Sequence, residues 1–158
     1  GIPFHPIKNS LALFISEILF RALKQTEPDE SLYHFLENSV RALDCCDDGL
    51  ANFHLVFMLK LSRYLGFAPN NDGEEESYFD LLNGVFTQEK PPHVHFIAAD
   101  VNSDFVKIMQ SDYVGMSVIK MTREGRFRLL EALVEYYKLH VPEFYGLNSL
   151  PVLHALFD

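Results

Sequence analysis

The chain opens with two stretches in which apolar side chains return every three or four residues, the spacing of an amphipathic helix. The first stretch predicts a helix over residues 6–25. Pro28 suits the first turn of a second helix, and the acidic residues around it suit the positive end of the helix dipole. This second helix is expected to turn one stripe of side chains inward: Leu32, Phe35, Leu36, Ser39, Val40 and Leu43.

Residues 50–65 are apolar on almost every side, which is typical of a helix at the centre of a bundle. Gly66 is expected to end this helix, and Gly49 marks a break before it. Lys60 and Arg63 are among its few polar residues and lie about 60° apart around the helix axis. The pattern therefore predicts a buried central helix with one basic edge.

The second half of the chain begins with a hairpin pattern. Residues 78–81 and 85–87 are rich in apolar side chains and flank an Asn-Gly dipeptide, which is typical of a tight hairpin turn. Phe79 and Phe86 are expected to pack this hairpin against the helices. The following residues 90–93, Lys-Pro-Pro-His, predict an extended connector.

Helical spacing returns toward the C-terminus. Residues 100–111 and 122–140 predict helices, the second with Thr122 as its N-cap. A short final helix is predicted after a cap at Ser149. Residues 112–121 fit either a short helix or extended chain.

These elements predict a mainly α fold, a compact bundle of about six helices with one small β-hairpin near residues 78–87. The length of 158 residues favours one helical domain spanning residues 1–158. Hydrophobic residues make up 48% of the chain and charged residues 22%, which excludes general disorder. Apolar runs stay well short of about 18 residues, so no membrane-spanning helix is predicted.

The net charge and the cysteine content limit the possible classes of function. The net charge of −9 disfavours a stand-alone nucleic-acid binder, because neutralising phosphates supplies most non-specific affinity. The start at Gly1, without Met or a secretory leader, indicates the middle of a longer protein. The adjacent Cys45 and Cys46 exclude a disulfide framework and a four-cysteine zinc site, and they favour a reducing, cytoplasmic location.

Catalytic and metal-binding motifs are scarce. The sequence has no nucleophile elbow, phosphate-binding loop or dinucleotide fingerprint, so neither an enzyme nor a cofactor is expected. His93 and His95 could bind zinc together with His54 or Asp100. Two histidines in a proline-rich connector are more often surface residues, and His54 fits the edge of the core, so no metal is expected.

The densest basic cluster comprises Arg123, Arg126 and Arg128, with Lys120 nearby. Arg128 is expected on the solvent face, paired with glutamates one turn away on the same helix. Arg126 falls on the apolar side, where a guanidinium can border a groove and bind a carboxylate or phosphate. The alternative is that Arg126 only snorkels from the edge of the core.

Short segments in a fixed order carry a family resemblance: residues 12–19 (ALFISEIL), 27–28 (EP), 32–33 (LY), 53–55 (FHL), 65–69 (LGFAP), 78–86 (YFDLLNGVF) and 147–149 (LNS). In these segments the chain resembles the C-terminal helical domain of RecO, the bacterial recombination mediator. The resemblance covers nearly the whole chain and is weakest over residues 88–121. Many members of that family carry a four-cysteine zinc element around the hairpin. Residues 70–92 contain no cysteine, so a zinc-less variant is expected.

The resemblance implies a non-enzymatic DNA repair and recombination mediator that displaces single-strand-binding protein, anneals strands and, with RecR, loads RecA. It implies an N-terminal OB-fold, presumed missing here, as the main contact for single-stranded DNA. It also implies a location in the cytoplasm, at the nucleoid. The alternative interpretation is a helical protein–protein interaction module with no DNA role.

In some members of that family, the acidic tail of single-strand-binding protein docks on this domain, next to a basic pair that precedes the Phe of the central helix. Ala51 and Asn52 occupy those positions here. Other basic residues beside long apolar stretches are therefore the candidate partner-binding residues: Lys60, Arg63, Arg123 and Arg126.

Overall fold

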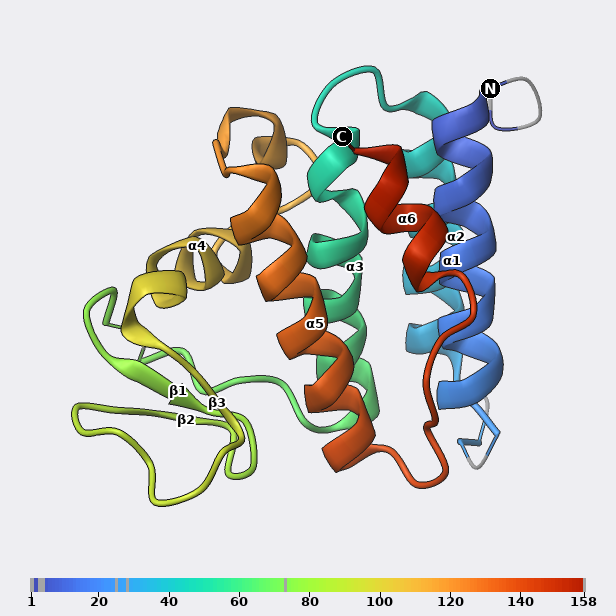
Figure 1. The fold of residues 1–158 in the computed structure, drawn as a ribbon. Coiled ribbons are helices and arrows are strands. Elements are labelled where there is room, and N and C mark those ends of the chain that lie inside the picture. The colour runs from blue at the N-terminus through green and yellow to red at the C-terminus, as the bar shows by residue number, and fades with distance from the viewer. Residues whose placement is uncertain (1, 3–4, 25, 28, 73, 158) are drawn as a thin grey trace.

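The computed structural model describes the chain except for residues 1, 3–4, 25, 28, 73 and 158. The described residues form six α-helices and a three-stranded sheet (Figure 1). The helices are α1 (Pro6–Ala22), α2 (Glu30–Cys45), α3 (Leu50–Leu65), α4 (Ala99–Met109), α5 (Arg123–His140) and α6 (Leu150–Leu156). The strands are β1 (Tyr78–Asp80), β2 (Val85–Thr87) and β3 (Phe96–Ile97). The predicted fold class, a helical bundle with a small β element, is confirmed.

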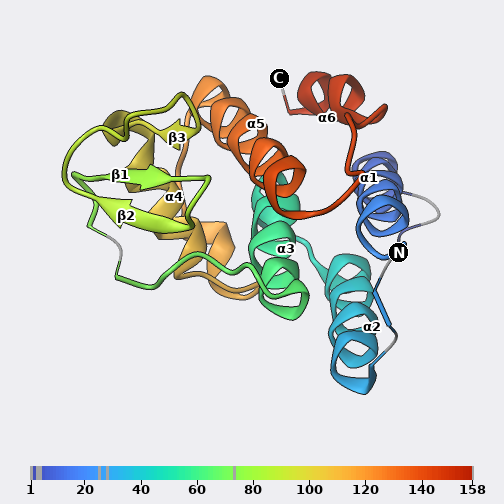
Figure 2. The ribbon, with the colours of Figure 1, turned by 90° about the horizontal axis from the view of Figure 1, so that it is seen from below.

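Helix α3 forms the centre of the bundle. It packs against α1 and α2 on one side and against α4 and α5 on the other (Figures 1 and 2). Most of its residues are buried, including the polar Asn52, His54 and Ser62. Gly49 and Gly66, which have positive φ angles of 78° and 90°, flank the helix. The central helix predicted from the apolar pattern is therefore confirmed.

The first two helices differ from the prediction at their ends. Helix α1 ends at Ala22, before the expected residue 25. Helix α2 begins at Glu30 because the Asp29 carboxylate accepts a hydrogen bond from the Leu32 amide at 2.7 Å. Pro28, the expected first-turn residue, lies outside the described residues.

The buried stripe of α2 is narrower than predicted. Four of the expected inward residues are buried: Leu32, Phe35, Ser39 and Leu43. Leu36 is half-buried, and Val40 is 54% exposed, so the inward placement of Val40 is wrong. Helix α2 packs against α1 and α3 along this stripe, and Val40 lies one position, about 100°, past Ser39 near its middle.

The hairpin prediction is confirmed, with one addition. Strands β1 and β2 pair antiparallel with Phe79 opposite Phe86, and both rings contact Phe105 of α4, at centroid distances of 4.8 and 5.8 Å. A third strand, β3, pairs antiparallel on the other side of β1, giving the order β2-β1-β3. Strand β3 has only two residues, too few for an alternating pattern to appear in the sequence.

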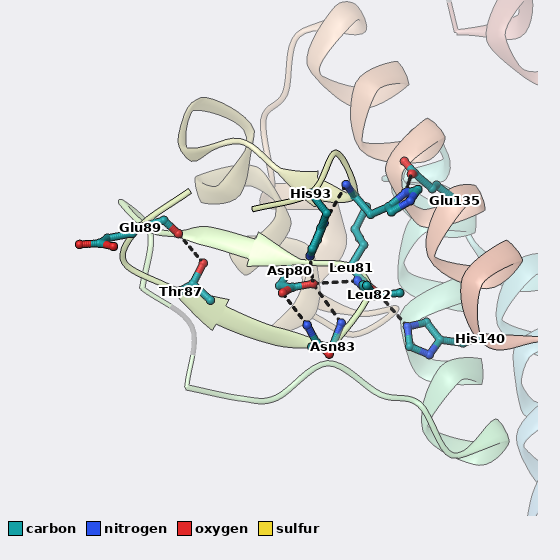
Figure 3. Close-up of polar contacts among 10 residues, drawn as sticks. Asp80, Leu81, Leu82, Asn83, Thr87, Glu89, His93, Glu135 and His140 are labelled. Atoms are coloured by element: carbon teal, nitrogen blue, oxygen red, sulfur yellow. Dashed lines mark hydrogen bonds and ion pairs between the residues drawn. The ribbon is translucent and has the colours of Figure 1, made fainter. Parts of the chain in front are cut away.

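Asp80 organises the turn of this hairpin (Figure 3). Its carboxylate accepts hydrogen bonds from the Leu82 amide (2.9 Å), the Asn83 amide (3.0 Å) and the Asn83 side chain (2.8 Å). The His93 Nε2 atom lies 3.0 Å from Asp80 Oδ1. Burial alone would raise the pKa of Asp80, but the hydrogen bonds from Asn83 and the proximity of His93 outweigh burial and lower it.

We expect Asp80→Asn to lower the free energy of unfolding by about 1 kcal/mol, because an amide accepts these hydrogen bonds more weakly than a carboxylate. Asp72→Asn, in the exposed loop before the hairpin, is the matched control and should change stability by less than about 0.5 kcal/mol. Urea denaturation at neutral pH measures both. Equal stabilities of the two variants would show that the turn does not depend on the Asp80 charge.

The ambiguous segment before α5 combines both expected conformations. It forms a short 3-10 helix, η2 (Gly115–Val118), and then runs extended to Thr122. Thr122 caps α5 as predicted, because its hydroxyl accepts a hydrogen bond from the Gly125 amide at 2.9 Å. No described helix combines the length and apolar character that crossing a membrane would demand.

The cap of α6 differs from the prediction. Ser149 occupies the N-cap position, but its side chain makes no capping hydrogen bond there. Instead, Glu17 of α1 accepts hydrogen bonds from the Asn148 amide (2.7 Å), the Ser149 amide (2.9 Å) and the Ser149 hydroxyl (2.6 Å). The start of α6 is therefore fastened to α1.

Candidate functional site

The structure separates the candidate basic residues into two places. Lys60 is half-buried on α3, and its Nζ atom lies 5.7 Å from the centroid of the Tyr113 ring. It borders an open groove of about 570 Å³ between α2 and the segment after α4, which we call the Lys60 groove. The groove residues that matter here are Phe35, Ser39, Lys60, Tyr64 and Tyr113. Arg63 is exposed and lies outside the lining of this groove.

Arg123 and Arg126 border a different pocket, where α5 and α6 meet. We call it the α5–α6 pocket, and its lining is mainly apolar or aromatic: His54, Arg123, Arg126, Phe127, Leu130, Leu153, His154 and Phe157. Its cavity volume is about 20 Å³, space for about one water molecule. The sequence-predicted pair of arginines is thus brought together beside an apolar surface, whereas Lys60 and Arg126 do not share a pocket.

Arg126 is fixed by a short polar network that starts on α3. The Asn52 side-chain amide donates to the backbone carbonyls of Met116 (2.9 Å) and Ile119 (3.2 Å). These two bonds orient the Asn52 oxygen, which accepts a hydrogen bond from Arg126 Nε at 3.3 Å. Burial lowers the pKa of Arg126, and the nearby Asp104 carboxylate partly offsets this. An arginine still remains charged, so the pocket has a positioned cation at its edge.

His54 separates the pocket from the core. It is 1% exposed and lies between the rings of Phe14, at a centroid distance of 5.9 Å, and Phe157, at 5.7 Å. Burial, together with the charge of Arg126, lowers the pKa of His54 to about 3, so the imidazole is neutral at physiological pH. Its Nδ1 atom is buried and has no hydrogen-bond partner among the described residues.

Arg128 does not pair as predicted. Its Nη1 atom lies 3.1 Å from Asp100 Oδ2, at the start of α4, rather than beside a glutamate of its own helix. The crossing of α4 over α5 brings Asp100 to this position. A helical wheel of α5 contains only the residues of that helix, so it cannot predict a contact with α4.

The histidines considered for zinc contact other side chains, and Figure 3 shows His93 next to Asp80. His93 lies beside Asp80, and His95 Nδ1 is 2.5 Å from Glu135 Oε1 on α5. His54 belongs to the α5–α6 pocket, and Asp100 pairs with Arg128, so the structure does not bring together the residues of the alternative zinc site. Within the described part of the chain, no three His, Cys, Asp or Glu side chains are arranged to hold a metal ion.

The other residues that line the α5–α6 pocket were not among the site residues predicted from the sequence: Phe127, Leu130, Leu153, His154 and Phe157. The His154 and Phe127 rings lie 3.8 Å apart, and Leu153 is buried. These contacts arise because the chain turns back after α5 and packs α6 against α1, next to α5 (Figure 2). No local pattern in the sequence indicates that return.

Comparison with known proteins gives a consistent result. A family model described as the C-terminal part of recombination protein O matches residues 4–151. The proteins named DNA repair protein RecO from Azobacteroides pseudotrichonymphae and Bacteroides fragilis are 39% and 42% identical over 98% and 100% of this chain. That from Phocaeicola vulgatus is 41% identical over 99% of it.

The chain spans 64–66% of the length of these curated relatives. No solved structure matches it. The family match covers almost every element described above, from α1 to the beginning of α6. The chain therefore belongs to the family of C-terminal domains of recombination protein O.

Proposed function

We propose that this domain is the partner-docking part of a non-enzymatic DNA repair and recombination mediator. The names of its relatives support a role in DNA repair. The proposed partner of the α5–α6 pocket is the tail of single-strand-binding protein, which is acidic and ends in an apolar residue with a free carboxylate. The observation that carries this proposal is the half-buried Arg126 at the edge of an apolar pocket.

The contact between Arg126 and Asn52 supports this choice of pocket. Position 52 is one of the two at which other members of the family can carry the basic pair used for tail docking. Here the Arg126 guanidinium reaches the Asn52 side chain from α5. A cation is therefore present beside the same part of α3, although the basic pair itself is absent. A carboxylate paired with arginine there would form charge-assisted hydrogen bonds next to apolar burial.

The other partners are assigned on the family resemblance. We propose RecR as a second protein partner, in the cytoplasm at the nucleoid. Single-stranded DNA is assigned mainly to the part of the family's length that this chain does not span. The net charge of −9 supports that assignment, since phosphate binding needs an excess of cations. The isolated domain is expected to bind single-stranded DNA weakly.

A peptide titration tests the docking site. The probe is a synthetic acidic peptide that ends in an apolar residue with a free carboxylate, and calorimetry measures its Kd. We expect Arg126→Ala to weaken binding by tenfold or more, which corresponds to about 1.5–3 kcal/mol for a charge-assisted contact. Arg126→Lys should retain part of the affinity, because the charge remains while the planar fork is lost. The same peptide with a C-terminal amide should bind more weakly than the free carboxylate.

Lys60→Ala is the matched control, since it removes a cation beside the Lys60 groove but leaves the α5–α6 pocket intact. Its Kd should stay within about twofold of the wild type. Thermal unfolding of each variant checks that it remains folded. Loss of binding in Lys60→Ala with normal binding in Arg126→Ala would show that the peptide binds in the Lys60 groove instead. Absence of wild-type binding at millimolar peptide would refute tail docking on this domain.

A further inference from the structure

The α5–α6 pocket is already filled by the chain itself. Its cavity volume of about 20 Å³ is far below the roughly 150 Å³ of an apolar cavity that admits benzene. The Phe157 ring stacks on His54, with a centroid distance of 5.7 Å and an angle of 4° between the rings. An apolar residue from another molecule could enter only if these side chains moved.

We propose that Phe157, together with Leu153 and His154, is a built-in competitor, in which Phe157 occupies the place that the apolar end of a docking peptide would take. This inference rests on the proposed function and concerns the regulation of the same pocket. Phe157 covers the His54 ring close to Arg126, and the terminal apolar residue of a peptide bound in the same place would cover the same ring. Peptide binding would then require the end of α6 to leave the pocket.

The construction of α6 suits such a displacement. The helix has seven residues, well under the roughly 12–15 that an isolated helix needs to be stable. Its start is fastened by the three hydrogen bonds to Glu17, whereas the described side chains toward its far end, Leu153, His154 and Phe157, line the mainly apolar pocket. Apolar contacts can be exchanged for equivalent contacts with a peptide at little net cost. The far end can therefore move while the Glu17 contact holds the start.

Phe157→Ala tests the proposal through the sign of its effect on peptide affinity. If Phe157 competes with the peptide, the variant opens the pocket and should bind the acidic peptide about tenfold more tightly than the wild type. If Phe157 is instead a wall of the peptide site, its removal should weaken binding. Val152→Ala is the matched control, because Val152 lies on the same helix and is 58% exposed. Its affinity should equal that of the wild type.

Amide hydrogen exchange across residues 150–157 supplies a second readout. Competition predicts that peptide binding speeds exchange in this segment, because α6 loses its contacts with the pocket. Weaker or unchanged binding by Phe157→Ala, or slower exchange in the complex, would overturn the proposed role of Phe157 as a competitor. The proposal of tail docking would remain intact. Absence of peptide binding by both the wild type and Phe157→Ala would refute the proposed docking function and, with it, the proposed competition by Phe157.

Discussion

Acidification from pH 6.5 toward pH 4 is expected to destabilise the domain through His54. The pKa of His54 is about 3 in the folded protein and ordinarily 6.5, so in this window the unfolded chain binds a proton that the folded protein excludes. The free energy of unfolding therefore falls as the pH falls, by up to about 1.4 kcal/mol per pH unit. Over two units the loss is about 2–3 kcal/mol, a large share of the stability of a domain of this size.

The variant His54→Leu should remove most of this dependence, because leucine is apolar and has no proton to gain. Urea denaturation at intervals between pH 6.5 and pH 4 measures it. His34→Gln is the matched control, since His34 is exposed on α2, and it should keep the wild-type slope. Asp80 and Glu17 have lowered pKa values and add their own loss of stability at more acidic pH. A slope unchanged in His54→Leu would contradict the burial of a neutral imidazole beside Arg126.

Gly49→Ala is expected to cost about 3 kcal/mol of stability. Gly49 has a φ of +78°, and a left-handed conformation costs an L-residue about 1–2 kcal/mol. A Cβ atom there would also lie 2.8 Å from the Cα and 2.9 Å from the amide nitrogen of Ser117, both backbone atoms. Overpacking of this kind adds about 1–3 kcal/mol, because the backbone of η2 has to shift away from α3.

Gly66→Ala is the control for the conformational part of this cost. Gly66 has a φ of +90°, but a Cβ there would have no atom within 4 Å. Its substitution should cost only the backbone penalty of about 1–2 kcal/mol. Chemical denaturation compares the two variants. Equal losses would show that the close approach between Gly49 and η2 does not constrain the protein in solution.

Elements defined by local patterns could be predicted from the sequence. Helix α3 is apolar on nearly all sides, a pattern that in a 16-residue helix is typical of a central buried position. The Asn83-Gly84 turn fixes the β1–β2 hairpin because Gly84 accepts a φ of +70°. Strand β3 and the exposure of Val40 could not be predicted. Strand β3 forms by pairing with the neighbouring strand β1, and the exposure of Val40 is set by which side of α2 packs against α1 and α3.

Only part of the candidate site could be predicted from the sequence. A helical wheel places Arg126 on the apolar side of α5, and the structure finds it bordering the α5–α6 pocket. Its contact with Asn52 joins residues 74 positions apart in the chain, so no local pattern contains it. The return of Phe157 onto His54 is a contact of the same long-range kind. The sequence also could not decide whether Lys60 and Arg126 share one pocket, because that depends on how α3 and α5 pack.

Mapping the bound peptide on the isotope-labelled domain by nuclear magnetic resonance tests the central claim most directly. The amide and methyl signals of the α5–α6 pocket, including those of Arg126, Leu130 and Leu153, are expected to shift in proportion to peptide occupancy. Signals of the Lys60 groove, such as those of Ser39 and Tyr64, should stay in place. Shifts confined to the Lys60 groove, or spread evenly over the surface, would contradict docking in the α5–α6 pocket.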